Sequence, residues 1–155
     1  MNRAEASKSV SNIDVADTAT NATHTTVIDT LGFAYAAVDV IFERVNAGAT
    51  ASAVANVLKL SQSDTNAATA FSDIVAFTGG TATSATVGYT IPTPANTSDT
   101  QVVRFNVDLR GKRRFLRVSA TPMTASVIAV NCRLTKGGEA PTNASGAGVA
   151  SYVSG

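Results

Sequence analysis

The sequence predicts an all-β fold: an antiparallel β-sandwich, jelly-roll-like, with a flexible N-terminal arm and a flexible C-terminal tail. Alanine, threonine, serine and valine make up about half of the 155 residues, and small or β-branched side chains favour pleated sheet. Six to eight short runs alternate apolar and polar residues, with turn residues between them. No long segment spaces its apolar residues with the 3.6-residue period of a helix, so a parallel α/β fold is not expected.

One domain is expected, because a single hydrophobic core commonly takes about 100–200 residues. We place this β-sandwich domain at residues 25–136. Residues 1–24 are polar and predict an N-terminal arm with room for one short strand. Residues 137–155 are rich in glycine, alanine and serine and predict a C-terminal tail.

Four strands are predicted in the first half of the domain. The clearest lies within residues 33–45, where every second residue from Ala36 to Phe42 is apolar. The others are residues 25–29, 54–60 and 71–78. The pair Leu31–Gly32 predicts a turn.

Residues 66–71 also fit one helical turn, with Ser63 or Asp64 available as its cap. Residues 86–91 predict a short strand. Residues 91–99 contain two prolines and predict a surface loop, because proline cannot donate a ladder hydrogen bond.

The second half predicts a three-stranded meander with one apolar side. Its strands lie within residues 102–109, 113–120 and 126–134, and Arg110–Gly111–Lys112 forms the tip of the first hairpin. The apolar residues that share a face are Val103, Phe105, Val107 and Leu109, then Leu116, Val118 and Ala120, then Ile128, Val130, Cys132 and Leu134.

The charge and hydropathy patterns argue against nucleic-acid and membrane partners. A net charge of +1 gives no general attraction to phosphate or to anionic lipid. The longest apolar run, residues 33–38, is far shorter than the roughly 20 residues that span a bilayer. The first residues carry mixed charges and no apolar secretion signal, so we expect the protein to stay in the cytoplasm where it is made.

No catalytic or cofactor motif is recognisable, and we expect neither an enzyme nor a bound cofactor or metal. The sole histidine, His24, lies in a threonine-rich segment and is interpreted as a solvated surface residue. Asp64 begins no complete calcium loop, and Asp39 and Glu43 fit a solvated strand face. Cys132 shares the apolar face of its strand and is interpreted as a small buried hydrophobe.

Basic residues cluster in the second half of the domain and form the one marked charge feature. We interpret them as a docking face for an acidic protein partner, in preference to a phosphate-binding patch. The alternative is a solvated outer face whose charges pair with Asp108 and its neighbours. The candidate docking residues are Arg104, Arg110, Lys112, Arg113, Arg117 and Arg133.

Three segments, Val27–Phe33, Val57–Val75 and Phe105–Pro122, carry a resemblance to a known group of proteins. The first fits the pattern IDT-x-GF. The second fits a strand, an SD turn and F-x-D-[IV], and the third fits the hairpin pattern DLRG-x-[KR]-R-[FY]-[LV]-R-V. In these patterns the chain resembles small tailed-bacteriophage virion proteins of the head decoration, or cement, type.

The resemblance implies a β-rich subunit that binds the outside of a capsid, often as a trimer. Its partners would be the major capsid protein and further copies of itself, and its location the head surface of the virion. A tail or head–tail connector protein is the first alternative. A carbohydrate-binding β-sandwich module is the second, with exposed aromatics drawn from Phe33, Tyr35, Tyr89, Phe115 and Tyr152.

Overall fold

Nine β-strands and two 3-10 turns make up the described part of the chain. The computed structural model describes residues 7–9, 14–18, 22–43, 55–78, 100–122 and 126–136. In chain order the strands are β1 (Ser7–Ser9), β2 (Asp14–Thr18), β3 (His24–Asp29), β4 (Tyr35–Glu43), β5 (Ala55–Ser63), β6 (Ser72–Asp73), β7 (Gln101–Asp108), β8 (Phe115–Pro122) and β9 (Ser126–Thr135). The 3-10 turns are η1 (Ala68–Ala70) and η2 (Val75–Phe77).

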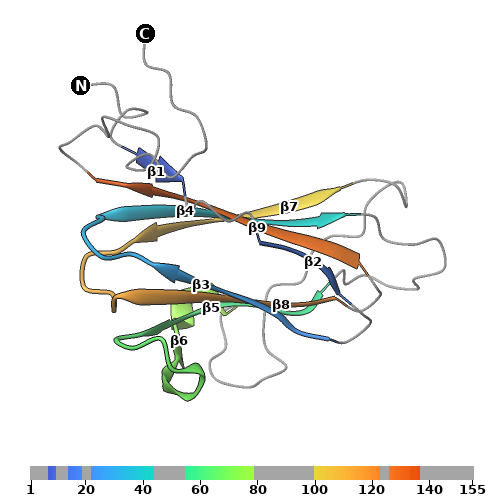
Figure 1. Ribbon diagram of the computed structural model, residues 1–155, viewed down its shortest axis with the longest axis horizontal. Coiled ribbons are helices and arrows are strands. Elements are labelled where there is room, and N and C mark those ends of the chain that lie inside the picture. The colour runs from blue at the N-terminus through green and yellow to red at the C-terminus, as the bar shows by residue number, and fades with distance from the viewer. Residues whose placement is uncertain are drawn as a thin grey trace, which may run out of the picture.

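The strands form two antiparallel sheets that lie face to face (Figure 1). In sheet A, β9 pairs with β4 on one side and with β1 and β2 on the other, and β7 lies beyond β4. Sheet B has the order β3-β8-β5-β6. The prediction of an all-β, two-layered antiparallel fold is therefore confirmed.

From β2 to β9 the strands pair in a nested pattern, in which the first strand along the chain pairs with the last and the second with the last but one. β2 pairs with β9, β3 with β8, β4 with β7 and β5 with β6. The chain thus forms one long two-stranded ribbon that is folded over on itself. The pairs β4–β9 and β5–β8 join neighbouring turns of the ribbon and complete the two sheets.

The predicted three-stranded meander is wrong. β7 and β9 belong to sheet A, but β8 between them belongs to sheet B. Alternation of side chains specifies which face of a strand is buried, but it does not specify which other strand pairs with it. The connection between Asp108 and Phe115 is long enough to pass between sheets packed about 10 Å apart, instead of reversing within one sheet.

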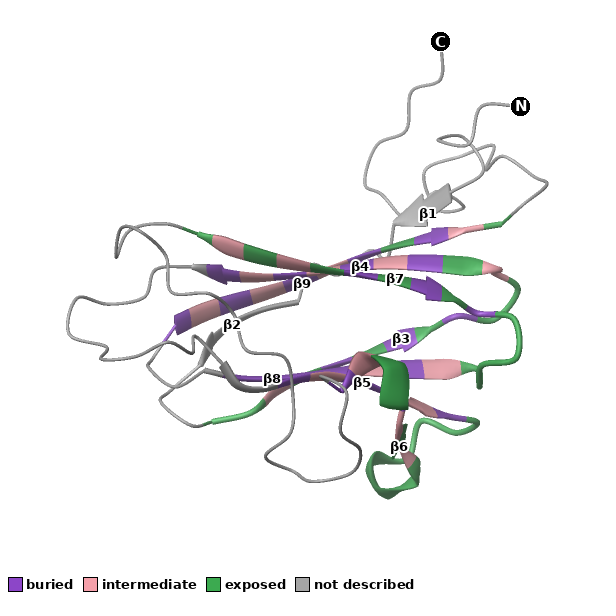
Figure 2. Ribbon diagram, turned by 180° about the vertical axis from the view of Figure 1, so that it is seen from behind, coloured by how far each residue is buried: buried purple, intermediate pink, exposed green. Residues whose placement is uncertain are grey.

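The core fills the space between the two sheets, and buried positions alternate with more exposed ones along the strands (Figure 2). Nearly all of its side chains are aliphatic, as the composition predicts; each removes apolar surface from water, which stabilises the fold by about 1.5–3 kcal/mol per Val, Leu or Ile. The buried apolar residues are Ile28, Ala36, Val38, Val40, Phe42, Leu58, Leu60, Ile74, Phe105, Val107, Leu109, Leu116, Val118, Ala120, Ile128, Val130, Cys132 and Leu134.

The segment after β5 departs from the sequence prediction. The strand expected at residues 71–78 shrinks to the two residues of β6, and η2 follows it. A helical turn is present at η1, but Ala67 is its N-cap and no side chain caps it, so neither Ser63 nor Asp64 has that role. Phe77 of η2 packs edge-on against Phe105, with ring centroids 5.9 Å apart. Side-chain packing against β7 therefore replaces strand pairing here.

Residues 1–24, predicted as an arm with one short strand, contribute two strands to sheet A. β1 pairs with residues 133–135 of β9, and β2 pairs with residues 126–130. The predicted strand at 86–91, the loop at 91–99 and the tail at 137–155 lie outside the described residues. The helical elements of the described ranges are single 3-10 turns, and no helix there could cross a membrane.

Candidate docking surface

The structure places the six predicted docking residues on three different surfaces. Arg104 and Arg133 lie on the outer face of sheet A, since their strand neighbours point into the core. Arg117 lies on the outer face of sheet B. Arg110, Lys112 and Arg113 belong to the connection between β7 and β8. The six do not share one face, because the strands that carry them are divided between the sheets.

Arg104 is held by a carboxylate of its own sheet. Asp39 lies directly opposite it on β4, and its two carboxylate oxygens accept hydrogen bonds of 2.6 and 2.7 Å from the Arg104 guanidinium. These hydrogen bonds raise the pKa of Arg104. This is the cross-strand pairing that the alternative interpretation of the basic cluster expects.

Arg117 holds the segment after β5 against sheet B. Its guanidinium donates hydrogen bonds to the Ala68 carbonyl oxygen (2.9 Å) and to Ser61 Oγ (3.3 Å). It also lies 4.4 Å from the centroid of the Phe71 ring, within the range of a cation–π interaction. Arg117 therefore has a structural role in the sandwich.

Two connections meet at one end of the sandwich. These are residues 30–34, between β3 and β4, and residues 109–114, between β7 and β8. Each turns at a glycine with a positive φ, Gly32 at 83° and Gly111 at 77°. This backbone conformation strains residues with a Cβ atom, so the glycines allow both turns.

Hydrogen bonds tie the two connections together. The Thr30 backbone N–H donates to the Arg114 carbonyl oxygen at 2.9 Å, and the Leu109 N–H donates to the Ala34 carbonyl oxygen at 2.9 Å. The Ala34 N–H donates to the carbonyl oxygen of Thr135 in β9 at 3.0 Å. The end of the sandwich is therefore preorganised. We call residues 29–35, 62–64, 108–115 and 133–136 the basic end.

The carboxylates of the basic end are all paired with arginines from the same end. Arg110 forks onto Asp108, with a shortest distance of 2.6 Å, and this hydrogen bonding lowers the pKa of Asp108 to about 2. Arg114 pairs with Asp29 at 2.6 Å. The Nε atom of the third arginine, Arg113, lies 3.6 Å from a carboxylate oxygen of Asp64.

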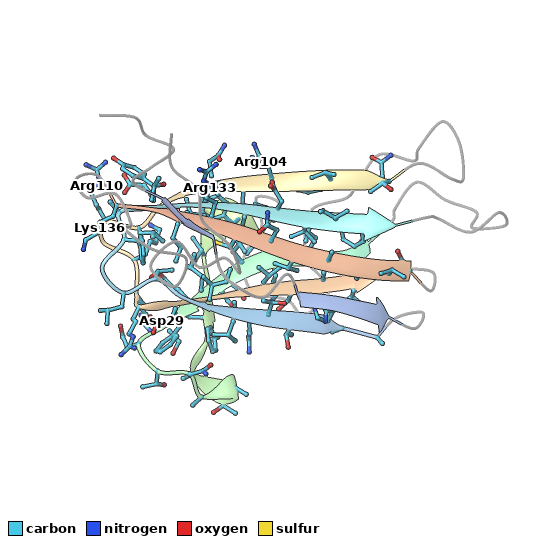
Figure 3. All side chains as sticks on the ribbon, turned by 45° about the horizontal axis from the view of Figure 1, so that its top comes forward. Asp29, Arg104, Arg110, Arg133 and Lys136 are labelled. Carbon is cyan, nitrogen blue, oxygen red and sulfur yellow. The ribbon has the colours of Figure 1, made fainter. Side chains whose placement is uncertain are left out.

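The basic end carries an excess of positive charge. Six of the chain's 12 cationic side chains belong to it, but only three of the 11 acidic side chains do. Figure 3 shows Arg110 and Lys136 at this end, Arg133 further along the same sheet towards Arg104, and Asp29 at the same end of the other sheet. Since the whole chain has a net charge of +1, this local excess of three charges is not visible in the composition.

Apolar groups are exposed beside these charges. Leu31, in the first connection, is 65% exposed. Tyr35, at the start of β4, is 43% exposed, and the Arg110 guanidinium lies 5.3 Å from the centroid of its ring. Exposed tyrosine and arginine on a preorganised end are typical of a protein-binding surface.

A shallow depression of about 390 Å³ lies at the surface of sheet A and borders the basic end, to which Tyr35, Asp108 and Thr135 of its lining belong. Ala37 lies opposite Asn106 on β7 and opposite Arg133 on β9, so a small side chain stands between two polar ones. The lining residues are Tyr35, Ala36, Ala37, Asn106, Val107, Asp108 and Thr135.

The described residues hold no group of three or more histidine, cysteine, aspartate or glutamate side chains that could bind a metal ion. His24, predicted to be a solvated surface residue, is half-buried in β3, and its Nε2 atom lies 3.1 Å from Thr26 Oγ1. Its strand pairs with β8 at Ala120 of the core, which explains the partial burial.

Cys132 is buried against the core, as predicted. Desolvation raises the pKa of its thiol to about 12, so the thiolate is scarce at neutral pH. We expect Cys132 to react with iodoacetamide far more slowly in the folded protein than in urea. Mass spectrometry of the alkylated chain over time measures both rates, and equal rates would contradict the buried placement.

Sequence reasoning missed three residues of the basic end: Asp29, Leu31 and Lys136. A signal for the first two was present in the turn predicted at Leu31–Gly32. This turn lies next to the 109–114 connection because β3 pairs with β8. The alternation of side chains does not determine that pairing.

No protein-family model matches the chain, and comparisons with curated proteins and with solved structures likewise found no match.

Proposed function

We propose that this chain is a jelly roll that serves as a non-enzymatic structural protein of a bacteriophage virion, decorating the outer surface of the head. The nested pairing of β2 to β9 is the observation that carries the proposal. A two-stranded ribbon folded over into two facing sheets corresponds to the jelly-roll architecture, which recurs in viral capsid proteins. The same architecture also recurs in lectins, so further support comes from the surface.

The surface supports a role in protein–protein contact. The segments Val27–Phe33 and Phe105–Pro122, which resemble those of decoration proteins, meet at the basic end. There they form a preorganised surface with exposed Leu31, Tyr35 and several arginines. A decoration subunit needs such a surface because many weak contacts, repeated over a shell, give durable attachment through avidity.

The proposed partners are the major capsid protein and two further copies of this chain in a homotrimer. Assembly would bury surface that a small sandwich with few aromatic side chains leaves exposed. Light scattering after size exclusion is expected to give three times the chain mass of 15.8 kDa. A stable monomer at micromolar concentration would contradict the trimer.

The location can be tested on the particle itself. Heads and tails of the source virion are separated and analysed by mass spectrometry. We expect the chain in the head fraction, and we expect mild denaturant to release it before the major capsid protein. Recovery with the tails would support the tail or connector alternative, and recovery with neither would overturn a virion role.

A carbohydrate-binding module is the second candidate, because Tyr35 lies in the depression together with Asn106 and Asp108. An exposed aromatic ring beside planar polar groups can stack on a sugar and bind its hydroxyl groups. Binding on a glycan array that is lost with Tyr35→Ala would favour this candidate. The decoration proposal expects no glycan binding.

A further inference from the structure

We propose that the basic end is the attachment surface of this subunit, and that its partner is an acidic protein segment of the shell which places carboxylate groups beside Arg110 and beside Arg133. This inference rests on the proposed function and adds to it the surface and the chemistry of the partner. It assigns no docking role to Arg104 or Arg117.

Charge complementarity identifies an acidic partner. The three carboxylates of the basic end are each paired with an arginine of that end. Three further cationic side chains, Lys112, Arg133 and Lys136, belong to it, so the described residues of this end carry three more positive than negative side chains. An acidic segment is attracted to such a surface during encounter and is favoured there over a basic one.

The depression gives the partner carboxylate a place to bind. Arg110 lies over the Tyr35 ring that lines the depression, and Arg133 is the β9 residue opposite Ala37, another lining residue. Asn106 and Thr135 also line it and can donate hydrogen bonds to an oxygen anion. Asp108 is the one acidic lining residue, and Arg110 offsets its charge.

Apolar contact adds to the charge. Leu31 and Tyr35 are both substantially exposed at the same end. Their burial by a partner would remove apolar surface from water, and arginine with tyrosine is typical of the residues that dominate interface energies.

The turns at Gly32 and Gly111 reduce the entropic cost of binding. In addition to the backbone hydrogen bonds between the two connections, Thr30 Oγ1 donates to the Arg114 carbonyl oxygen at 2.6 Å. Groups that are already ordered lose little freedom on binding, so more of the interaction energy remains as affinity.

A protein segment fits this surface better than a nucleic acid does. Asp29, Asp64 and Asp108 stand exposed among the cations. A phosphate backbone, with its regular spacing of negative charge, would meet these carboxylates as well as the cations. A protein partner can place its charges selectively and can contact Leu31.

The outer face of sheet B fits the role less well. β6 pairs with β5 at the edge of this sheet, and Arg117 is engaged with Ser61, Ala68 and Phe71. Lys59, on the same face, pairs with Asp73 at 2.7 Å, and both side chains are only 13% exposed. These cations hold the sheet together.

The attachment surface is tested with neutral substitutions that each remove one positive charge. We compare Arg110→Gln, Arg133→Gln and the double variant with Arg104→Gln, a control on the same sheet face whose guanidinium is held by Asp39 and which lies outside the basic end. Cosedimentation with shells that lack the protein measures affinity. We expect each basic-end substitution to weaken binding about tenfold, the double variant more, and Arg104→Gln less than about threefold.

The outcomes separate the two proposals. If the unaltered protein does not bind shells, the proposed function fails and this inference fails with it. If the unaltered protein binds but the double variant and Arg104→Gln bind equally well, only the inference is overturned. Leu31→Ser is expected to weaken binding without changing its salt dependence, because it removes apolar area and no charge.

A second experiment tests the chemistry of the surface without shells. Hexaglutamate peptide is titrated into the isotopically labelled protein and compared with a thymidine hexanucleotide. The peptide is expected to shift the amide signals of Tyr35, Ala37 and Thr135, and its affinity is expected to fall about tenfold in the double variant. Tighter binding of the hexanucleotide at these residues, or peptide shifts confined to other residues, would overturn the proposal.

Discussion

Replacing Phe42 by alanine is expected to lower the free energy of unfolding by about 3–5 kcal/mol, the usual cost of removing a buried phenylalanine ring. Phe42 is 1% exposed and lies in β4 opposite Ile128 of β9. Apart from Phe105, the buried core residues have smaller side chains, so few neighbours can move in to fill the cavity. Urea unfolding followed by circular dichroism measures the loss.

Val102→Ala is the matched control for Phe42→Ala. Val102 lies in β7, next to β4 in the same sheet, but its side chain is 58% exposed. Its truncation should change the free energy of unfolding by less than about 0.5 kcal/mol. A loss below about 1 kcal/mol for Phe42→Ala would show that the two sheets do not pack as described.

Replacing Arg117 by alanine is expected to release the segment that carries η1 and β6 from sheet B. The variant loses two hydrogen bonds and the contact with the Phe71 ring, a change worth about 1–3 kcal/mol. Hydrogen exchange should accelerate at least tenfold at Ala70 and Ile74, whose amides donate to the Ala67 and Leu60 carbonyl oxygens. Core amides such as those of β4 should change much less.

Arg117→Lys separates charge from shape. Lysine keeps the positive charge but has no planar fork to bond two acceptors and stack on Phe71 together, so an intermediate acceleration is expected. Arg104→Ala, which removes a cation from the other sheet, should leave these amides unchanged. Unaltered exchange in Arg117→Ala would mean that the Lys59–Asp73 pair and the burial of Ile74 hold the segment by themselves.

The sequence predicted the local structure of the sheets well because alternation is a local property. The apolar phase of residues 36–42 and of residues 128–134 matches the buried face of β4 and β9. The turns at Gly32 and Gly111 were also predicted, because a glycine between two strand patterns indicates a reversal. Each of these features depends on a few neighbouring residues.

Pairing between distant strands was not predictable in the same way. The prediction of a meander assumed that β8 returns beside β7, but β8 pairs with β3 and β5. A strand with one apolar face packs equally well in either sheet of a sandwich, so its own pattern does not select the sheet. The polar composition of residues 1–24 likewise did not indicate that β1 and β2 pair with β9.

The candidate site was predictable only where its residues are close together in the sequence. The basic residues of the 109–114 connection were predicted to dock, and they do lie together at one end of the structure. Arg104 and Arg117 were grouped with them through the meander, and the crossing between sheets separates them. Tyr35 was recognised as an aromatic candidate, but its position beside Asp108 follows from the pairing of β4 with β7.

A cryo-EM reconstruction of the source virion would show directly where this subunit lies and which of its surfaces attaches it. We expect density for this sandwich on the outside of the head, with the turns at Gly32 and Gly111 directed at the shell and a shell carboxylate beside Arg110. Density that places the chain in the tail, or that attaches it to the head by the outer face of sheet B, would contradict this expectation.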